Sequence, residues 1–254
     1  MIELNSQRLS VSIVSHRQAV LIESLLGDLN RVCSGRDIEV ILTLNLPEEL
    51  PFNADRYTFQ VKLISNPAPL GFGANHNQAF QCATGAYFCV LNPDIALQED
   101  PFTHLLPLLV QSQMGLVAPV VVDGKGILED SARYFPTPWE IAGKFFGGQS
   151  RVYREQKGAI GSPDWVAGMF MLFRHDVYEE IGGFDAKRYF MYYEDVDICF
   201  RLRQRQYEIA LSRDAIVIHH ARRSSHHNLR YLTWHVSSML KFFLIYYRCK
   251  IWPS

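Results

Sequence analysis

Apolar and polar residues alternate along the first half of the chain in a pattern that predicts strands followed by helices. Apolar runs predict strands at residues 9–15, 38–44, 61–65 and 87–91. Amphipathic stretches predict helices at 18–32 and 74–83, and Gly85 suits the end of the second helix. Because strands that alternate with helices pair in parallel, we expect an α/β fold whose ligands bind beyond the carboxyl ends of the strands.

The second half of the chain is less regular. We expect strands at residues 116–122, 165–173, 209–211 and 215–219, with a turn at Gly168. Helices are expected at 175–181, 194–206 and from 229 onward, and long loops at 123–163. No repeat, low-complexity tract or Ser/Gly linker divides the chain, so residues 1–254 are predicted to form one domain.

Composition narrows the class of protein. A net charge of −1 argues against a protein that binds nucleic acid through bulk electrostatics. No signal peptide is visible, and no apolar run reaches the ~18–20 residues of a membrane span. The five cysteines form no C-x-x-C motif, which is typical of reduced thiols in a cytoplasmic protein.

Three carboxylates, those of Glu194, Asp195 and Asp197, lie within four residues at the start of a predicted helix. A helix N-terminus favours such a cluster, because its free N–H groups and dipole attract negative charge. A reaction that needs a positioned base favours it as well. The residues alone leave both explanations open.

Two further motifs lie near the ends of predicted strands. Asp94 ends the segment LNPD at 91–94, where a carboxylate can bind Mg²⁺ or Mn²⁺ or simply form a turn. Asn66 and the segment LGFGANHN at 70–77 form a polar loop that opens a helix. Its N–H groups can face an anion or a ribose, although a glycine turn with an asparagine cap explains it equally well.

Residues 219–227 (HHARRSSHH) place four histidines and two arginines in nine positions after a predicted strand. Histidine can complete a metal shell, and arginine can bind a diphosphate with its forked donors. No cysteine supports a zinc site here, and a solvated basic loop is the alternative.

In order and spacing, these motifs resemble the inverting glycosyltransferases of family 2, which have the GT-A fold. Within them the likeness is to the bacterial rhamnosyltransferase-like branch that builds O-antigen and other surface polysaccharides. The resemblance covers residues ~9 to ~225. It rests on VSIVS at 11–15, the loop at 66–77, LNPD at 91–94, DWVAG at 164–168, GGFD at 182–185, YEDVD at 193–197, and His219 with Ser224.

The resemblance implies a Rossmann-like, mostly parallel sheet flanked by helices in a single domain. Residues 1–95 would bind the nucleotide sugar, 96–228 would carry the acceptor and catalytic half, and 229–254 would form a C-terminal helix. Asp94 would bind the metal with His219 nearby, and Asp195 would be the catalytic base. The remaining implied site residues are Trp165, Gly168 and Glu194 on the acceptor side, and Ser15, Asn45, Asn75, Asn77 and Asn92 around the nucleotide.

The implied reaction is a single displacement that inverts the anomeric carbon of a nucleotide-diphosphate sugar. Asp195 would take the proton of the acceptor hydroxyl, and Mg²⁺ or Mn²⁺ would neutralise charge on the leaving group. The branch implies deoxythymidine-diphosphate rhamnose (dTDP-rhamnose) as donor, with a uridine-diphosphate (UDP) sugar as the next choice. The implied acceptor is a glycan or lipid-linked glycan, and no nucleic acid partner is expected.

Three positions depart from the family pattern. The second strand ends in Leu44-Asn45, without the usual acid, and the first strand runs into His16-Arg17. Arg222 and Arg223 replace glycines after the histidine, which makes them candidates for holding the diphosphate. The missing acid leaves a non-catalytic binding relic as an alternative. A sugar nucleotidyltransferase is another, although residues 15–18 lack the glycine of its phosphate loop.

The end of the chain, residues 234–252, mixes aromatic residues with Lys241, Arg248 and Lys250. This pattern suits an amphipathic helix on the inner face of a membrane, where a lipid-linked acceptor would lie. A packed terminal helix or a dimer contact is the alternative. We therefore expect a cytoplasmic protein, with peripheral membrane contact left open.

Overall fold

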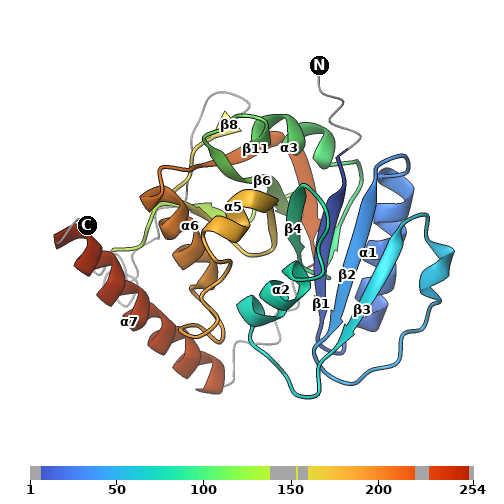
Figure 1. The fold of residues 1–254 in the computed structure, drawn as a ribbon, viewed down its shortest axis with the longest axis horizontal. Helices are drawn as coiled ribbons and strands as arrows, with labels where there is room; N and C mark the ends of the chain where they lie inside the picture. Colours follow the sequence, from blue (N-terminus) through green and yellow to red (C-terminus); the bar gives the residue numbers. More distant parts are fainter. Residues whose placement is uncertain (1–6, 138–152, 154–159, 221–228, 252–254) are drawn as a thin grey trace.

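The computed structural model describes residues 7–137, 153, 160–220 and 229–251 (Figure 1). Its first half follows the apolar runs of the sequence. The strands β1 (Leu9–Ser15), β2 (Ile38–Leu44), β3 (Gln60–Ser65) and β4 (Tyr87–Leu91) pair in parallel in the order β3-β2-β1-β4. The predicted bounds are confirmed for β1, β2 and β4, because a strand buried on both faces reads as a continuous apolar run.

The second half extends the same sheet but breaks its parallel order. Among the described residues the order continues from β4 through β10 (Phe170–Arg174), β6 (Met114–Asp123) and β11 (Glu208–His219) to β5 (Ile95–Ala96). Strand β10 runs antiparallel to both of its neighbours, β4 and β6. The short strand β8 (Ile160–Gly161) pairs with β11. The mostly parallel sheet is confirmed, and the parallel pairing expected from the alternation in the first half holds for β1 to β4.

Two predicted strand regions fold differently from the expectation. The run at 165–173 divides at the turn around Gly168 into β9 (Trp165–Val166) and β10, and β9 pairs with β7 (Ala132–Arg133) in a separate small sheet. A Cβ atom at Gly168 would lie 2.9 Å from the ring of Phe72, so a larger residue here would have to displace that ring. The two short strands expected at 209–219 form one strand, β11, with a register shift between Ser212 and Ile216.

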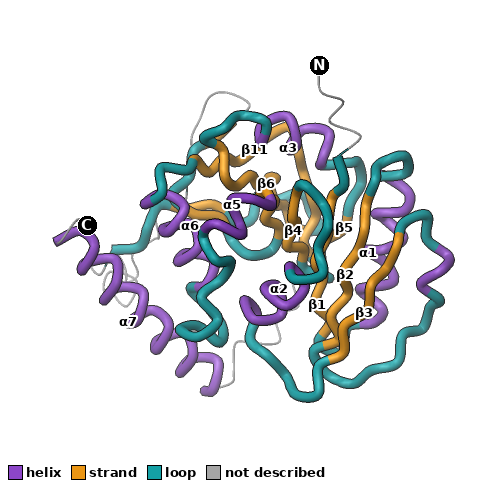
Figure 2. Tube along the Cα trace, in the orientation of Figure 1, coloured by secondary structure: helices purple, strands orange, loops and turns teal. Residues whose placement is uncertain are grey.

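Helices cover both faces of the sheet (Figure 2). On one face, α1 (Ala19–Val32) and α3 (Phe102–Leu109) pack into one apolar cluster with alternate strand residues. On the other face, α5 (His175–Glu180), α6 (Glu194–Gln204) and α7 (Leu229–Ile251) pack into a second cluster, and α2 (Phe72–Phe80) contributes its terminal phenylalanines. The helix expected at 74–83 begins and ends earlier, as α2, and α3 was not predicted. Within the described residues, one 3₁₀ turn lies at Ala54–Arg56.

Helix α7 runs along the outside of the molecule, at the end opposite β3 (Figure 1). It confirms the helix predicted from residue 229 onward. Within the described ranges, no helix combines the length and the apolarity that crossing a bilayer requires.

The carboxylate of Glu39 ties together the amino ends of the central strands, away from the carboxyl-end motifs. Its side chain is fully buried and accepts hydrogen bonds from Ser10 Oγ at 2.6 Å and Thr84 N at 2.6 Å, and Lys62 Nζ lies 2.8 Å away. Burial by itself would raise the pKa of Glu39, but the hydrogen bonds from Lys62, Ser10 and Thr84 outweigh it and lower the pKa to about 2.

We expect Glu39→Gln to reduce the free energy of unfolding at pH 7 by about 2–3 kcal/mol, because a buried charge-assisted network is lost. The lowered pKa of Glu39 makes its contribution fully present above the unfolded-state pKa of about 4.5, and the contribution falls as pH drops toward about 2. Urea titrations at pH 7 and pH 3 should therefore show a smaller difference between wild type and variant at pH 3. A difference that stays the same at both pH values, or an equal loss in the exposed control Glu49→Gln, would contradict this role.

Candidate active site

Two adjoining cavities open at the carboxyl ends of the central strands. The first, about 480 Å³ and here called the strand cavity, is lined by residues that follow β1, β2 and β4, among them His16, Asn45 and Asp94. The second, about 470 Å³ and here called the aromatic cavity, is lined by residues of β9, the Gly168 turn, the start of α6 and the inner face of α7. Phe72, Asn92 and Met191 line both cavities, so the two share one boundary.

Three buried asparagines shape the wall of the strand cavity. Asn45 donates to the carbonyl of Leu70 at 3.0 Å and accepts from the Leu70 N–H at 2.8 Å, so its amide pairs with the loop as a strand backbone would. Asn66 bridges Asn45 and Asn75 with its amide nitrogen at 3.0 and 2.7 Å. The structure thus brings the predicted residues Asn45, Asn75 and Asn92 to this cavity, where the first two also hold the loop that follows β3.

Asp94 lies beside His219, as the sequence motifs implied. His219 Nε2 is 3.3 Å from Asp94 Oδ2, and its other ring nitrogen, Nδ1, is 2.7 Å from Glu129 Oε2. Burial of the ring opposes its charge, but the hydrogen bonds to Asp94 and Glu129 outweigh burial and raise the pKa of His219 to about 9. Glu129 is thus a member of the site that the sequence analysis missed, and its contact joins residues 90 positions apart.

The chemistry of this cluster fits a divalent metal. Asp94 lines the strand cavity, and its second carboxyl oxygen, Oδ1, is buried and has no hydrogen-bond partner. A buried carboxylate oxygen without a partner is costly unless a cation or donor meets it. In the described part of the chain, no three acidic, histidine or cysteine side chains form a complete metal cage. Asp94 and His219 therefore offer a partial set that leaves positions for diphosphate and water oxygens.

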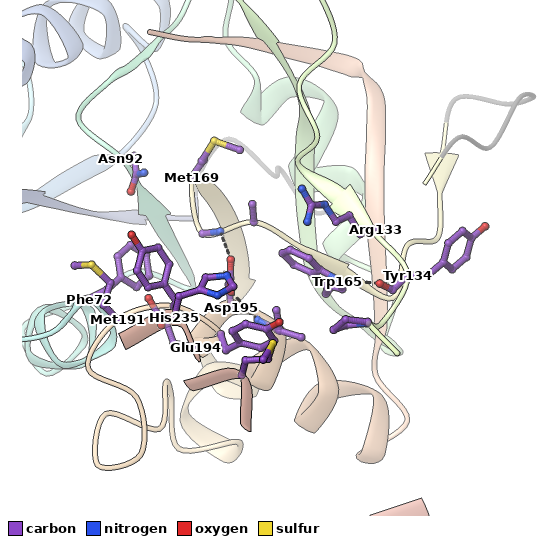
Figure 3. A pocket seen from close by; sticks show the side chains of 17 residues that line it. Phe72, Asn92, Arg133, Tyr134, Trp165, Met169, Met191, Glu194, Asp195 and His235 are labelled. Atoms are coloured by element: carbon purple, nitrogen blue, oxygen red, sulfur yellow. Dashed lines mark hydrogen bonds between the residues drawn. The ribbon is translucent and has the colours of Figure 1, made fainter. Parts of the chain in front are cut away.

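Asp195 reaches the aromatic cavity from the first turn of α6 (Figure 3). Its Oδ2 accepts from the Gly168 N–H at 3.2 Å, and its Oδ1 accepts from the Val196 N–H at 2.9 Å. The two residues before Glu194, Tyr192 and Tyr193, have left-handed backbones with φ of 70° and 67°. Left-handed non-glycine residues store strain and are common where a chain is bent to position a reactive group.

Glu194 and Asp195 are neighbours in the chain, but the Glu194 side chain is more deeply buried. Glu194 is 6% exposed, and burial, followed by the charge of Asp195, raises its pKa to about 8. Its Oε2 is buried without a partner. Burial also raises the pKa of Asp195, against the Gly168 and Val196 N–H groups, which stabilise its charged form. Burial thus opposes the charged form of both acids, and only Asp195 has backbone N–H groups that stabilise its charge against it.

The third acid of the cluster, Asp197, has a structural role. It is 1% exposed and accepts from Arg201 Nε at 2.7 Å, one helical turn away. Glu194 and Asp195 therefore line the aromatic cavity, whereas Asp197 forms an ion pair within α6. Sequence reasoning left this division open, because helix capping and catalysis favour the same residue types.

The aromatic cavity also contains the predicted acceptor residues Trp165 and Gly168. The guanidinium of Arg133 lies 5.5 Å from the centre of the Trp165 ring, and it lowers the pKa of Asp195 as a minor contribution. Arg133 and two residues of α7, His235 and Met239, line this cavity and were not predicted. The short β7–β9 pairing that carries Arg133 into place has no periodic signal in the sequence.

Ser15 and Asn77, which the resemblance implied to lie around the nucleotide, line neither of the two cavities. Ser15 is fully buried, and its Oγ accepts from the Gln18 N–H at 3.2 Å before α1. Asn77 points away from both cavities: it donates to the Phe184 carbonyl at 2.7 Å and accepts from Tyr178 Oη at 2.8 Å. Arg222 and Arg223 lie outside the described residues.

The start of α1 is filled by the chain itself. Glu48 accepts from the Arg17 N–H at 3.1 Å and from the Ala19 N–H at 3.0 Å. A nucleotide phosphate bound in Rossmann manner at this helix start would compete with that carboxylate. The N–H groups at the start of α1 are therefore already paired with a carboxylate of the chain.

Comparisons with known proteins show which sequences the chain resembles. A sequence model of the "Glycosyltransferase like family 2" matches residues 51–236. The rhamnosyltransferase WbbL of Escherichia coli K12 is 27% identical over 248 residues, which cover 91% of each chain. The N-acetylglucosaminyl-diphospho-decaprenol L-rhamnosyltransferase of Mycobacterium tuberculosis is 26% identical over 239 residues, 85% of this chain and 77% of that protein.

Solved structures share the fold at low sequence identity. GalNAc-T7, solved with UDP, GalNAc and Mn²⁺, aligns with a TM-score of 0.67 and 16% identity over 86% of this chain. The mannosyltransferase PcManGT of Pyrobaculum calidifontis, solved with GDP-Man and Mn²⁺, gives a TM-score of 0.65 and 16% identity over 93% of this chain. The present chain spans 44% and 65% of those two longer chains.

Proposed function

The chain belongs to the family 2-like glycosyltransferases, and from that premise we propose that it transfers rhamnose from dTDP-rhamnose to a lipid-linked saccharide, with inversion. One observation carries the proposal: Asp94 and Asp195 line adjoining cavities that share a wall. The strand cavity would hold the nucleotide sugar, and the aromatic cavity would hold the acceptor. We further propose that the reaction belongs to bacterial surface polysaccharide synthesis.

The choice of sugar and acceptor is supported by the relatives. Two of them are named rhamnosyltransferases, and the Mycobacterium tuberculosis protein is named for a decaprenol-linked acceptor. A largely apolar cavity beside Asp195 suits a lipid-linked saccharide better than a fully polar glycan. UDP sugars are the second choice of donor, since GalNAc-T7 was solved with UDP.

In the proposed reaction, Asp195 accepts the proton of the acceptor hydroxyl as that oxygen attacks the anomeric carbon. The new bond forms on the face opposite the leaving group, and the bond to the diphosphate oxygen breaks with its electron pair. The Gly168 and Val196 N–H groups orient the carboxylate of Asp195. Glu194, protonated beside it, would donate a hydrogen bond to the acceptor.

Asp94 and His219 would hold Mg²⁺ or Mn²⁺ on the donor side. When bound, the ion neutralises charge that develops on the leaving diphosphate. Glu129 would accept the Nδ1–H of His219 and orient the ring, and Nε2 would have to lose the proton that faces Asp94 before it could hold the ion. In this arrangement the strand cavity binds the nucleotide without the acid that usually ends the second strand of the family.

The two alternatives from the sequence are less well supported. A sugar nucleotidyltransferase would place phosphate after the first strand, where Glu48 occupies the N–H groups of Arg17 and Ala19. A non-catalytic relic would not need a strained turn to hold an aspartate against the acceptor cavity. We also propose a cytoplasmic location with peripheral membrane contact through α7.

Purified protein should transfer rhamnose from dTDP-rhamnose to a short-chain analogue of N-acetylglucosaminyl-diphospho-decaprenol in the presence of Mn²⁺ or Mg²⁺. EDTA should abolish transfer, because the diphosphate then leaves without its counter-charge. Mass spectrometry of the product detects the added sugar, and NMR of its anomeric proton shows whether the configuration is inverted. Transfer from UDP sugars alone would mean that the donor is a UDP sugar and not dTDP-rhamnose. A product with the anomeric configuration of the donor would exclude a single displacement. No transfer from any nucleotide sugar would refute the proposed function.

A further inference from the structure

Helix α7 carries an apolar stripe on the face that points away from the protein. Leu232, Val236, Leu240 and Leu244 are 60%, 41%, 56% and 74% exposed. Residues four apart on a helix advance by about 40° and 6 Å each, so the four form a continuous stripe about 18 Å long. Solvent-exposed leucines at regular helical spacing differ from the scattered apolar residues of an ordinary surface.

The opposite face of α7 belongs to the protein core and to the candidate site. Phe242 and Tyr246 are buried in the second apolar cluster. His235 and Met239, about two turns and one turn before Phe242, line the aromatic cavity. The stripe and the aromatic cavity are therefore built by two faces of the same helix.

Helix α7 also holds the loop that precedes Asp195. Ser238 Oγ donates to the Met191 carbonyl at 2.9 Å, and Lys241 Nζ donates to the Arg188 carbonyl at 2.9 Å. The Trp234 ring lies 4.8 Å from that of Phe190. If α7 binds a surface, these contacts would hold the loop at residues 188–191 at a fixed distance from that surface.

The charges of α7 indicate what the stripe contacts. The helix sequence contains Arg230, Lys241, Arg248 and Lys250 and no acidic residue. Lys241 and Arg248 are exposed, and helical geometry places them along one flank of the stripe. A second copy of this helix would bring positive charges together, whereas an anionic lipid surface attracts them while burying the leucines.

We propose that the outer stripe of α7 docks on an anionic lipid bilayer and brings the aromatic cavity to the membrane surface. The apolar part of a lipid-linked acceptor then passes from the bilayer along α7 into the cavity. The contact with the bilayer stands on the surface of α7 alone, and the role given to the acceptor rests on the proposed function.

The test is co-sedimentation of the full chain with vesicles of phosphatidylcholine that contain about 40% phosphatidylglycerol, an anionic lipid that attracts the basic flank. We expect wild type to bind these vesicles, and to bind less at high salt or to pure phosphatidylcholine. L240S/L244S should bind ~10–100-fold more weakly, because two leucines lose their place in the lipid. The matched control V20S/L63S changes two apolar residues, 71% and 54% exposed, on α1 and β3 and should bind as wild type does.

Two results would overturn the docking surface. One is vesicle binding that L240S/L244S retains in full. The other is a wild-type dimer in analytical ultracentrifugation that L240S/L244S converts to a monomer, with no vesicle binding by either protein, which would assign the stripe to a second copy of the chain.

Sugar transfer and vesicle binding are expected to depend on different residues. L240S/L244S should transfer sugar to the short-chain acceptor at the wild-type rate, and Asp195→Asn should bind vesicles as wild type does. Vesicle binding by a wild-type protein that transfers no sugar would refute the function and support the docking surface.

Discussion

Asp195→Asn is expected to lower sugar transfer by ~10²–10⁴-fold while the fold and donor affinity remain, because an amide cannot accept the proton of the acceptor hydroxyl. The substitution keeps the size of the side chain and its carbonyl oxygen, which can still accept from the Gly168 N–H. Initial rates at saturating donor measure the loss in kcat, and thermal unfolding measures the stability. Near-normal turnover would remove Asp195 from the role of base.

Asp197→Asn is the matched control, since it is the same change two residues away on α6. Asp197 is buried against Arg201, so its variant should lose stability, by about 3–5 kcal/mol if the pair is broken. Transfer per folded molecule should stay close to wild type. A loss of kcat in Asp197→Asn equal to that in Asp195→Asn would mean that the rate depends on the integrity of α6, and not on one proton acceptor.

Asp94→Asn is expected to lower transfer by about 10³-fold, because counter-charge supplied to the leaving diphosphate is worth several kcal/mol in the transition state. An amide is a poorer ligand than a carboxylate for Mg²⁺ or Mn²⁺. Electron paramagnetic resonance of Mn²⁺ with nucleoside diphosphate and protein reports binding without turnover. The exposed Asp55→Asn is the control and should bind Mn²⁺ as wild type does.

Glu129 gives a graded test of the same centre. Glu129→Ala should weaken Mn²⁺ binding by ~10–100-fold, because His219 loses the partner that orients its ring. Glu129→Gln keeps an oxygen that can accept from Nδ1–H and should restore part of the affinity. Equal Mn²⁺ affinity in wild type, Asp94→Asn and Glu129→Ala would place the ion elsewhere.

Much of the fold could be predicted from the sequence, because buried parallel strands leave a strong local signal. The bounds of β1, β2 and β4 follow directly from apolar runs. The direction of β10 could not be predicted, since an apolar run does not encode which way a strand enters the sheet. Helix α3 was missed because Pro107 interrupts a leucine-rich stretch that otherwise has helical spacing.

The residues of the candidate site that belong to short sequence motifs could also be predicted, whereas those brought together by strand pairing could not. Asp94 and Asp195 each belong to a short motif, so their positions beside the cavities could be predicted. Glu129 could not, because its contact with His219 depends on how β6 and β11 pair across the sheet. Asn77 was placed with the nucleotide by its motif, although the fold uses its amide to hold Phe184.

The central claim is that two carboxylates serve one reaction from opposite sides, and calorimetric titration of donor with Mn²⁺ tests it most directly. The account predicts that Asp195→Asn binds the nucleotide sugar within about 3-fold of wild type, since it removes only a proton acceptor. It predicts that Asp94→Asn binds the donor at least ~10-fold more weakly. Equal weakening in the two variants, or wild-type affinity in both, would contradict the division of roles.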